Sequence, residues 1–207
     1  MAGMSSRSHW ENVYRTRPWR EVSWFRPHLD ASLALIEAAA PDRARSIIDV
    51  GGGASTLVDD LVARGYRDVT VLDHSAAALD VAKARLGERA RTVEWRCDDA
   101  TTASLPAHSY DLWHDRAVFH FLTRAEDRAA YVRQIRHSVK RGGHVIVAPF
   151  GPEGPAKCSG LDVVRYSAEA LLAELGPAFR LEREMSERHE TPAGKVQSFI
   201  YCLFRLT

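Results

Sequence analysis

Residues 46–56 read SIIDVGGGAST, a short apolar run that ends in three consecutive glycines. The β-branched residues at 46–50 are typical of a strand that is buried on both faces of a sheet. The glycines that follow let backbone N–H groups approach a ligand without obstruction by side chains. The stretch therefore predicts the first strand, turn and helix of an α/β sheet, with a ligand site where the strand ends.

Strand and helix patterns alternate on both sides of this stretch. Helices are expected at 30–40, 55–64, 75–86 and 167–175, and from a capping box at Thr123 and Glu126 to the glycines at 142 and 143. Strands are expected at 46–50, 69–72, 92–96, 110–113 and 144–148, and two longer ones at 179–190 and 195–206. The Pro-Ala-Gly turn between the last two strands indicates an antiparallel hairpin.

Five βα units followed by a hairpin predict an α/β fold with a doubly wound, mainly parallel seven-stranded sheet and an antiparallel C-terminal hairpin. The 207 residues are long for a minimal domain and short for two. We therefore expect one domain at 1–207, with its sheet core at 45–207. Ligands of such sheets bind beyond the carboxyl ends of the strands, where the strand order reverses.

The composition argues against several classes of protein. Lys plus Arg (28) and Asp plus Glu (27) nearly cancel, so the net charge gives no support for nucleic-acid binding. No apolar run approaches the ~20 residues of a membrane span, and we expect no membrane partner. Three widely separated cysteines fit a reducing, cytoplasmic setting, and the histidines lack the spacing of metal ligands, so we predict no metal.

The glycine turn and two acidic positions, Asp73 and the Asp98-Asp99 pair, indicate a nucleoside-binding site. The turn resembles a dinucleotide fingerprint, but the position of the third fingerprint glycine holds Thr56. Asp73 follows Gly51 by 22 residues, close to the ~20 at which an acidic side chain meets ribose hydroxyls. The alternative is that Asp73 only caps the helix that begins near Ser75.

After the third predicted strand comes Cys97-Asp98-Asp99-Ala100. One of the two carboxylates is placed to accept a hydrogen bond from an adenine amino group, and we favour Asp99, which precedes the small Ala100. The alternative is a carboxylate that caps its own loop.

Four segments carry a family resemblance: DVGGGAS at 49–55, LDHS at 72–75, DDA at 98–100 and YDLWHDRAVFHFL at 110–122. Together they resemble the class I S-adenosylmethionine-dependent methyltransferases over about residues 45–148. The resemblance implies that S-adenosyl-L-methionine is the methyl donor. It also implies a set of donor-binding residues: Asp49, Gly51, Gly52, Gly53, Asp73, His74, Asp99, Ala100 and His114.

Two further segments bear on the acceptor. HWENVY at 9–14 and VSWF at 22–25 are similar to a subgroup that includes lysine methyltransferases of translation factors. Those enzymes carry a lysine-glycine pair after strand four, where this chain has Asp115-Arg116, as thiopurine-type small-molecule methyltransferases do. We therefore expect a small-molecule acceptor, with a protein-lysine methyltransferase and a catalytically silent nucleoside-binding domain as alternatives.

The loop after the fourth predicted strand supplies the candidate catalytic residues. Asp115 could hold the ammonium of the donor or an acceptor amine, and Arg116 could bind an acceptor anion or pair with Asp115. His120 is either a general base or a packed core histidine. Phe119 and Phe150 are expected to line the acceptor pocket.

An aromatic segment precedes the sheet, and we expect residues 1–28 to form a lid over the donor. Trp10, Tyr14 and Trp24 are its candidate substrate-binding residues. Two alternatives stay open: ordinary aromatic packing on the core, and a surface for single-stranded RNA, because arginines interleave with the aromatics.

Overall fold

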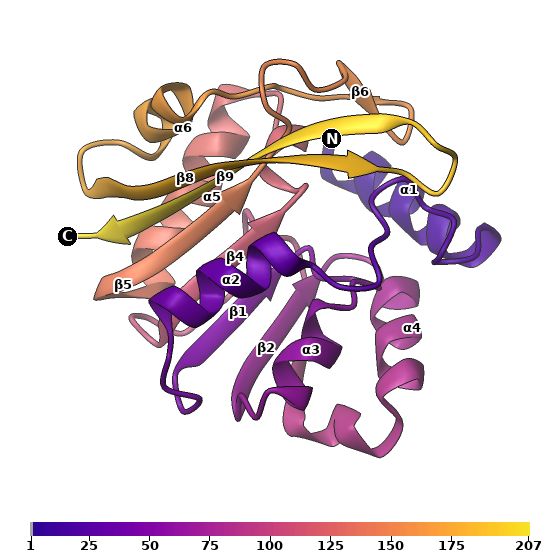
Figure 1. Cartoon of the computed structure of the whole chain (residues 1–207), viewed down its shortest axis with the longest axis horizontal. Coiled ribbons are helices and arrows are strands. Elements are labelled where there is room, and N and C mark those ends of the chain that lie inside the picture. Colours follow the sequence, from indigo (N-terminus) through magenta and orange to yellow (C-terminus); the bar gives the residue numbers. More distant parts are fainter. Residues whose placement is uncertain (1) are drawn as a thin grey trace.

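The computed structural model describes residues 2–207, with side chains from residue 7 onward. Seven strands form one sheet in the order β3-β2-β1-β4-β5-β9-β8 (Figure 1). They are β1 (Ser46–Val50), β2 (Asp68–Asp73), β3 (Val93–Cys97), β4 (Tyr110–Arg116), β5 (Val139–Ala148), β8 (Phe179–Glu190) and β9 (Val196–Leu206). The first five strands are parallel to one another, and the strand order reverses between β1 and β4.

Six α-helices surround this sheet: α1 (Ala2–Thr16), α2 (Asp30–Ala39), α3 (Leu57–Ala63), α4 (Ala76–Leu86), α5 (Ala125–Ser138) and α6 (Ala168–Leu175). Shorter elements are the 3-10 turns η1 (Gly87–Thr92) and η2 (Phe119–Phe121) and the two-residue strands β6 (Lys157–Cys158) and β7 (Leu161–Asp162). In the described residues 2–207, no helix is long and apolar enough to cross a membrane.

Alternate residues of the central strands enter two separate hydrophobic cores, as side chains of a buried strand must. Ile47 of β1 packs in the core that contains apolar residues of α2, α3 and α4. Ile48 and Val50 pack in the core that contains residues of α5 and α6. Helices on both faces therefore bury the sheet and leave the carboxyl ends of its strands available for a site.

The predicted fold class is confirmed, and so are several local predictions. β8 and β9 form the expected antiparallel hairpin, and β9 also pairs antiparallel with β5. Ser75 caps α4 as its sequence predicted, because its hydroxyl oxygen accepts from the Ala78 N–H at 3.2 Å.

Three predictions are wrong. The expected capping box does not form, because Arg124 is the N-cap residue of α5 and makes no side-chain cap bond. The helix also ends before the glycines at 142 and 143, since Val139 already pairs with Tyr110 of β4 and the glycines lie inside β5. Finally, residues 98–109 contain turns and no helix, so four βα units precede the hairpin, not five.

Candidate functional site

A cavity of about 410 Å³ lies at the carboxyl ends of β1, β2, β3 and β4. Its wall includes the glycine turn, the residues that follow β2 and β3, and the loop that follows β4. Trp10 and Tyr14 of α1 and Cys158 of β6 complete it. The fold thus brings three candidate donor-binding positions, the glycine turn, Asp73 and Asp99, to one cavity.

The glycine turn needs its glycines for steric reasons. Gly51 and Gly53 have φ values of +66° and +40°, a region that side chains disfavour. A Cβ atom on Gly51 would lie 2.0 Å from Val118 Cγ2, and one on Gly53 would lie 2.8 Å from Asp73 Oδ2. No Cβ atom fits at either position, so the backbone of the turn packs directly against the strand-four loop and against Asp73 of β2.

Asp73 ends β2 inside the cavity wall and is almost fully buried. Its Oδ1 accepts a hydrogen bond from the Ser75 N–H at 2.8 Å. Its Oδ2 is the atom that a Cβ placed on Gly53 would meet at 2.8 Å. Burial raises the pKa of Asp73 to about 7, well above the ordinary value of an aspartate. His74 lines the same wall, and burial lowers the pKa of its ring.

Asp98, Asp99 and Ala100 follow β3 and also line the cavity. The Oδ1 atom of Asp99 accepts from the N–H and the hydroxyl of Thr101, at 2.8 and 2.6 Å. The loop-capping geometry is therefore present. Since only Oδ1 is engaged among the described residues, Oδ2 of Asp99 remains available to a ligand.

Asp49 and His114 lie behind the glycine turn, where they line a smaller hollow beside the main cavity. Asp49 Oδ1 lies 2.7 Å from His114 Nδ1, and His114 Nε2 lies 2.9 Å from the Ser32 hydroxyl. All three side chains are buried. Ser32 belongs to no motif, and its only signal in the sequence is that it is a polar residue within an apolar helix. This series of hydrogen bonds links β1 to β4 and to α2 behind the glycine turn.

Arg116 lines the main cavity, although its side chain is only 5% exposed. Its Nε donates to the Tyr201 hydroxyl at 2.7 Å, and its guanidinium carbon lies 4.3 Å from the centre of the Phe199 ring. The Nη2 atom makes no hydrogen bond among the described residues and lies 3.5 Å from Glu187 Oε2. Arg116 therefore pairs with Glu187 of β8, and the alternative of a local pair with Asp115 does not form.

Asp115 lies beneath the cavity rather than in its wall. Its Oδ1 accepts from the Val118 N–H at 2.9 Å, and its Oδ2 accepts from the Phe119 N–H at 3.0 Å and the Tyr131 hydroxyl at 2.5 Å. Burial raises its pKa to about 6. These donors occupy the carboxyl group, so the structure gives Asp115 the task of holding the strand-four loop, not an ammonium.

The structure does not bring His120, Phe119 or Phe150 to the cavity surface, contrary to expectation. All three are fully buried, and His120 Nδ1 accepts from the Phe150 N–H at 3.2 Å. Burial lowers the pKa of His120 to about 3, so the ring is neutral and its one lone pair is already used. The packed-core alternative describes His120 better than a general base does.

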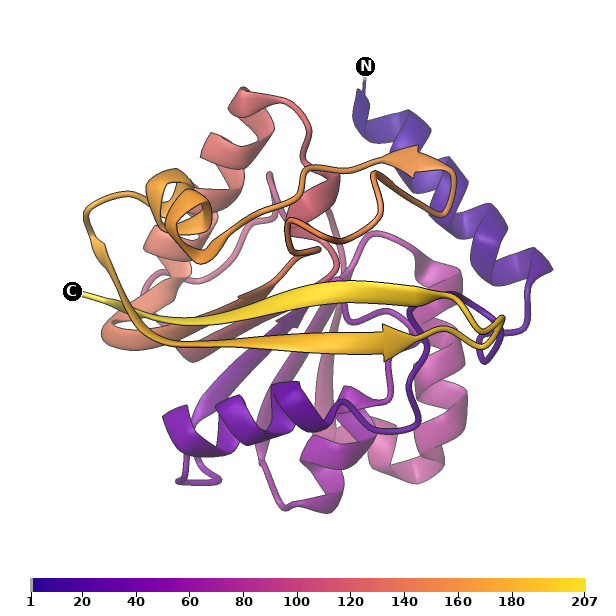
Figure 2. The ribbon, with the colours of Figure 1, turned by 45° about the horizontal axis from the view of Figure 1, so that its top comes forward.

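Helix α1 lies beside α4 and near the β6–β7 segment (Figure 2), and its Trp10 and Tyr14 line the cavity. Trp10 packs edge-on against Trp24 and Phe121, with ring centres 5.3 and 5.1 Å apart. On one side, Glu11 Oε2 accepts from the Ser75 hydroxyl and the Ala77 N–H, at 2.5 and 3.0 Å. Glu11 was not identified from the sequence, and it anchors α1 to the N-terminus of α4.

The cavity fits the donor that the resemblance implies. The glycine turn lets a ligand approach the backbone, and the buried Asp73 carboxylate is suited to a ribose diol. The Asp99 carboxylate, beside the small Ala100, is suited to an adenine amino group. The aromatic rings of Trp10, Tyr14 and Trp24 offer faces that attract a sulfonium cation.

Comparisons with known proteins support this reading. A family model described as a methyltransferase domain matches residues 47–143. EEF1A lysine methyltransferase 2 of Danio rerio is 21% identical over 196 residues, covering 88% of this chain and 78% of that protein. The eEF1A lysine and N-terminal methyltransferase of Danio rerio is 25% identical over 131 residues, which cover 63% of this chain and only 19% of that protein.

Two solved structures share the fold. The Burkholderia thailandensis 1,6-didemethyltoxoflavin-N1-methyltransferase, with 1,6-didemethyltoxoflavin and S-adenosylhomocysteine bound, has a TM-score of 0.74 at 19% identity, covering 100% of this chain and 89% of its own. A structure concerned with converting a disulfide bond into a thioacetal group during echinomycin biosynthesis has a TM-score of 0.76 at 18% identity, covering 97% and 93%. The family model over residues 47–143, the fold and the cavity together support a class I S-adenosylmethionine-dependent methyltransferase.

Proposed function

We propose that this enzyme transfers the methyl group of S-adenosylmethionine to a small-molecule acceptor. The observation that carries the proposal is Arg116, a cation in a cavity wall that also contains the aromatic rings of Trp10, Tyr14 and Trp24. Its Nη2 atom is buried and makes no hydrogen bond among the described residues. A buried donor in that state is stabilised by an acceptor molecule that brings an anionic or carbonyl oxygen.

At the donor end, the glycine turn, Asp73, His74, Asp99 and Ala100 are the residues we assign to donor binding. S-adenosylmethionine supplies an electrophilic methyl group on a sulfonium when it is bound. The buried Asp73 carboxylate accepts hydrogen bonds from the ribose diol, and Oδ2 of Asp99 accepts one from the adenine amino group. Asp49 and His114 act from behind, because their buried hydrogen bonds hold the turn in place.

For the acceptor, Trp10, Tyr14 and Trp24 line the same cavity as Arg116. Methyl transfer mainly requires that the nucleophile be aligned and water be excluded. The aromatic rings align the nucleophile and exclude water. A lysine ammonium has no acceptor atom, so it would leave the Nη2 donor of Arg116 unsatisfied.

We also propose that α1 and the segment after it, residues 1–28, act as the lid. The support is that α1, whose Trp10 and Tyr14 line the cavity, contacts both the start of α4 and the β6–β7 segment. Glu11 bonds to the start of α4, and His9 Nε2 lies 3.3 Å from the Ser159 hydroxyl beside β6. Closure over the acceptor excludes water and leaves a space suited to a small molecule.

The second candidate is a protein-lysine methyltransferase. It is favoured by one finding, the 21% identity to EEF1A lysine methyltransferase 2 of Danio rerio over 88% of this chain. The buried Arg116 cation is the observation that argues against it.

The deciding experiment follows the label. The enzyme is incubated with methyl-labelled S-adenosylmethionine and fractionated cell extract, and the label in small molecules and in polypeptides is counted separately. We expect label in the small-molecule fraction, and Asp73→Ala as a matched control should remove it. Label found only in polypeptide would refute the small-molecule proposal and favour the lysine methyltransferase.

A further inference from the structure

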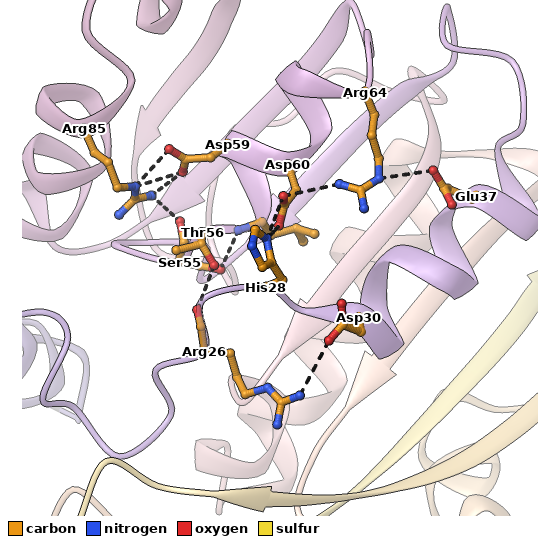
Figure 3. Close-up of polar contacts among 11 residues, drawn as sticks. Arg26, His28, Asp30, Glu37, Ser55, Thr56, Asp59, Asp60, Arg64 and Arg85 are labelled. Carbon is orange, nitrogen blue, oxygen red and sulfur yellow. Dashed lines mark hydrogen bonds and ion pairs between the residues drawn. The ribbon is translucent and has the colours of Figure 1, made fainter.

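Arg85, in the last turn of α4, lies on the side of the glycine turn that faces away from the cavity. Its Nη1 donates to the Ala54 carbonyl at 2.9 Å, and its Nη2 donates to the Ser55 carbonyl at 2.6 Å. The same guanidinium forms an ion pair with Asp59 of α3, with Nη2 and Oδ2 2.6 Å apart. Figure 3 shows Arg85 between the carboxylate of Asp59 and the backbone at Ser55. One side chain therefore ties the end of the glycine turn to two helices.

The face of this guanidinium is covered by Trp19, which lies between α1 and α2. The Arg85 guanidinium carbon lies 4.7 Å from the centre of the Trp19 ring. Trp19 is itself held by Phe25, with ring centres 5.4 Å apart. Arg26 adds a second link between the same segment and the turn, because its carbonyl accepts from the Thr56 hydroxyl at 2.9 Å (Figure 3).

The segment that connects α1 to the sheet core thus rests on the residue that holds the glycine turn. The Arg85 side chain is 17% exposed and that of Asp59 is 25% exposed, so their interactions are only partly screened by water. Hydrogen bonds from a charged donor to carbonyl oxygens are stronger than neutral ones. The Arg85 guanidinium lies between the carbonyls of the glycine turn and the ring of Trp19. A shift of the Trp19 ring therefore affects the position of the turn, and a shift of the turn affects Trp19.

We propose that Arg85 is a positioning residue for the donor, and that its contact with Trp19 couples docking of the N-terminal segment to the shape of the glycine turn. The inference rests on the proposed lid role of that segment. Two expectations follow from it. Donor affinity depends on Trp19, which does not line the main cavity, and the effects of changing Trp19 and Arg85 are not independent.

The test is a double-mutant cycle on the affinity for S-adenosylhomocysteine, measured by calorimetry without an acceptor. Arg85→Met keeps the aliphatic stem and removes the cation; we expect affinity to fall on the order of tenfold, because two charge-assisted bonds to the turn are lost. Trp19→Ala should weaken binding roughly threefold to tenfold. The double variant should bind no more weakly than Arg85→Met alone.

A second readout needs no ligand. In the free protein, the amides of residues 51–56 should exchange hydrogen faster in Arg85→Met, since the Ser55 N–H donates to the Gly52 carbonyl within the turn that Arg85 holds, and the Gly51 N–H donates to the Leu72 carbonyl of β2. The matched control is Arg91→Met, at an exposed arginine that pairs with Glu88. It should change neither affinity nor exchange.

Unchanged affinity in both single variants, or strictly additive losses in the double variant, would overturn the coupling. If Arg85→Met fails to fold, Trp19→Ala decides alone, because normal affinity and normal exchange in that variant also overturn it. Failure of the proposed function has a different signature. Label would enter polypeptide, or a protein without α1 would transfer normally, while the binding cycle would keep its own result.

Discussion

Asp73 shows how burial can link binding to pH. Burial raises its pKa to about 7, so the folded protein holds a proton there more tightly than the unfolded chain does. Its contribution to stability is therefore complete below about pH 4 and is lost as the pH rises through about 7. The ribose diol, in contrast, needs the carboxylate as a hydrogen-bond acceptor. In the free enzyme, the pH range that removes stability is the range that creates the donor site.

We expect Asp73→Asn to weaken binding of S-adenosylhomocysteine by about 1–3 kcal/mol at pH 8, the range for a lost hydrogen bond at a buried site. In the wild type, affinity should rise between pH 6 and pH 8, and the variant should lose most of that rise. Calorimetry at several pH values measures both effects.

Asn keeps an oxygen that can accept from the Ser75 N–H, so the variant should stay folded. Thermal unfolding of the free protein is the control. A variant with normal affinity and a much lower melting temperature would show that Asp73 is only a helix cap, and the ribose assignment would be wrong.

The elements differ in how far the sequence could predict them. β1 and the cap at Ser75 depend on local rules, a β-branched run before glycine and a side chain that accepts from its own helix, and both formed as expected. The end of α5 did not, because pairing of Val139 with Tyr110 of β4 stopped the helix before its glycines. A partner from another strand overrides a local stop signal, and no window of sequence contains that partner.

The candidate site shows the same division. The glycine turn and Asp73 lie where the sequence placed them, since the ends of parallel strands share one edge of a sheet. The contacts of Arg116 come from Glu187 and Tyr201, which the C-terminal hairpin brings to β4. Residues so distant along the chain carry no spacing signal, so the sequence offered only an acceptor anion or the neighbouring Asp115 as partners of Arg116.

At the level of elements, deleting residues 1–16 should lower the transfer rate at least about tenfold while leaving the sheet folded, because α1 excludes water from the transfer step. The sheet should survive, since its two cores consist almost wholly of residues outside α1. Transfer is followed with labelled donor and the acceptor fraction, and circular dichroism reports the fold.

Glu11→Gln is the milder companion, because it weakens the contact with Ser75 and Ala77 without removing a helix. Its rate should lie between those of the wild type and the deletion. Full activity in the folded, truncated protein would exclude a lid. Loss of the fold would support the alternative in which α1 is ordinary core packing.

Across the whole molecule, the two ends of the cavity belong to different halves of the sheet. β1, β2 and β3 end at the turn, Asp73 and Asp99, which we assign to the donor. The proposed acceptor end combines β4 with the hairpin of β8 and β9, through Arg116 and its partners. Substitutions in the hairpin can therefore change the acceptor without disturbing the donor, provided that Arg116 keeps a counter-charge.

The molecule as a whole should discriminate between nucleoside ligands. S-adenosylhomocysteine at about 100 times its Kd should stabilise the protein by about 2.7 kcal/mol, which raises the melting temperature by roughly 5–10 °C. NAD and NADP should give no comparable rise. Thr56 occupies the position of the third fingerprint glycine, and its buried side chain is held by the Arg26 carbonyl. The Asp73 carboxylate would also repel a 2′-phosphate. Thermal scans with each ligand at matched concentration measure the effect. A rise with a nicotinamide dinucleotide as large as that with S-adenosylhomocysteine would contradict the donor assignment, because the same turn would then be accommodating a pyrophosphate.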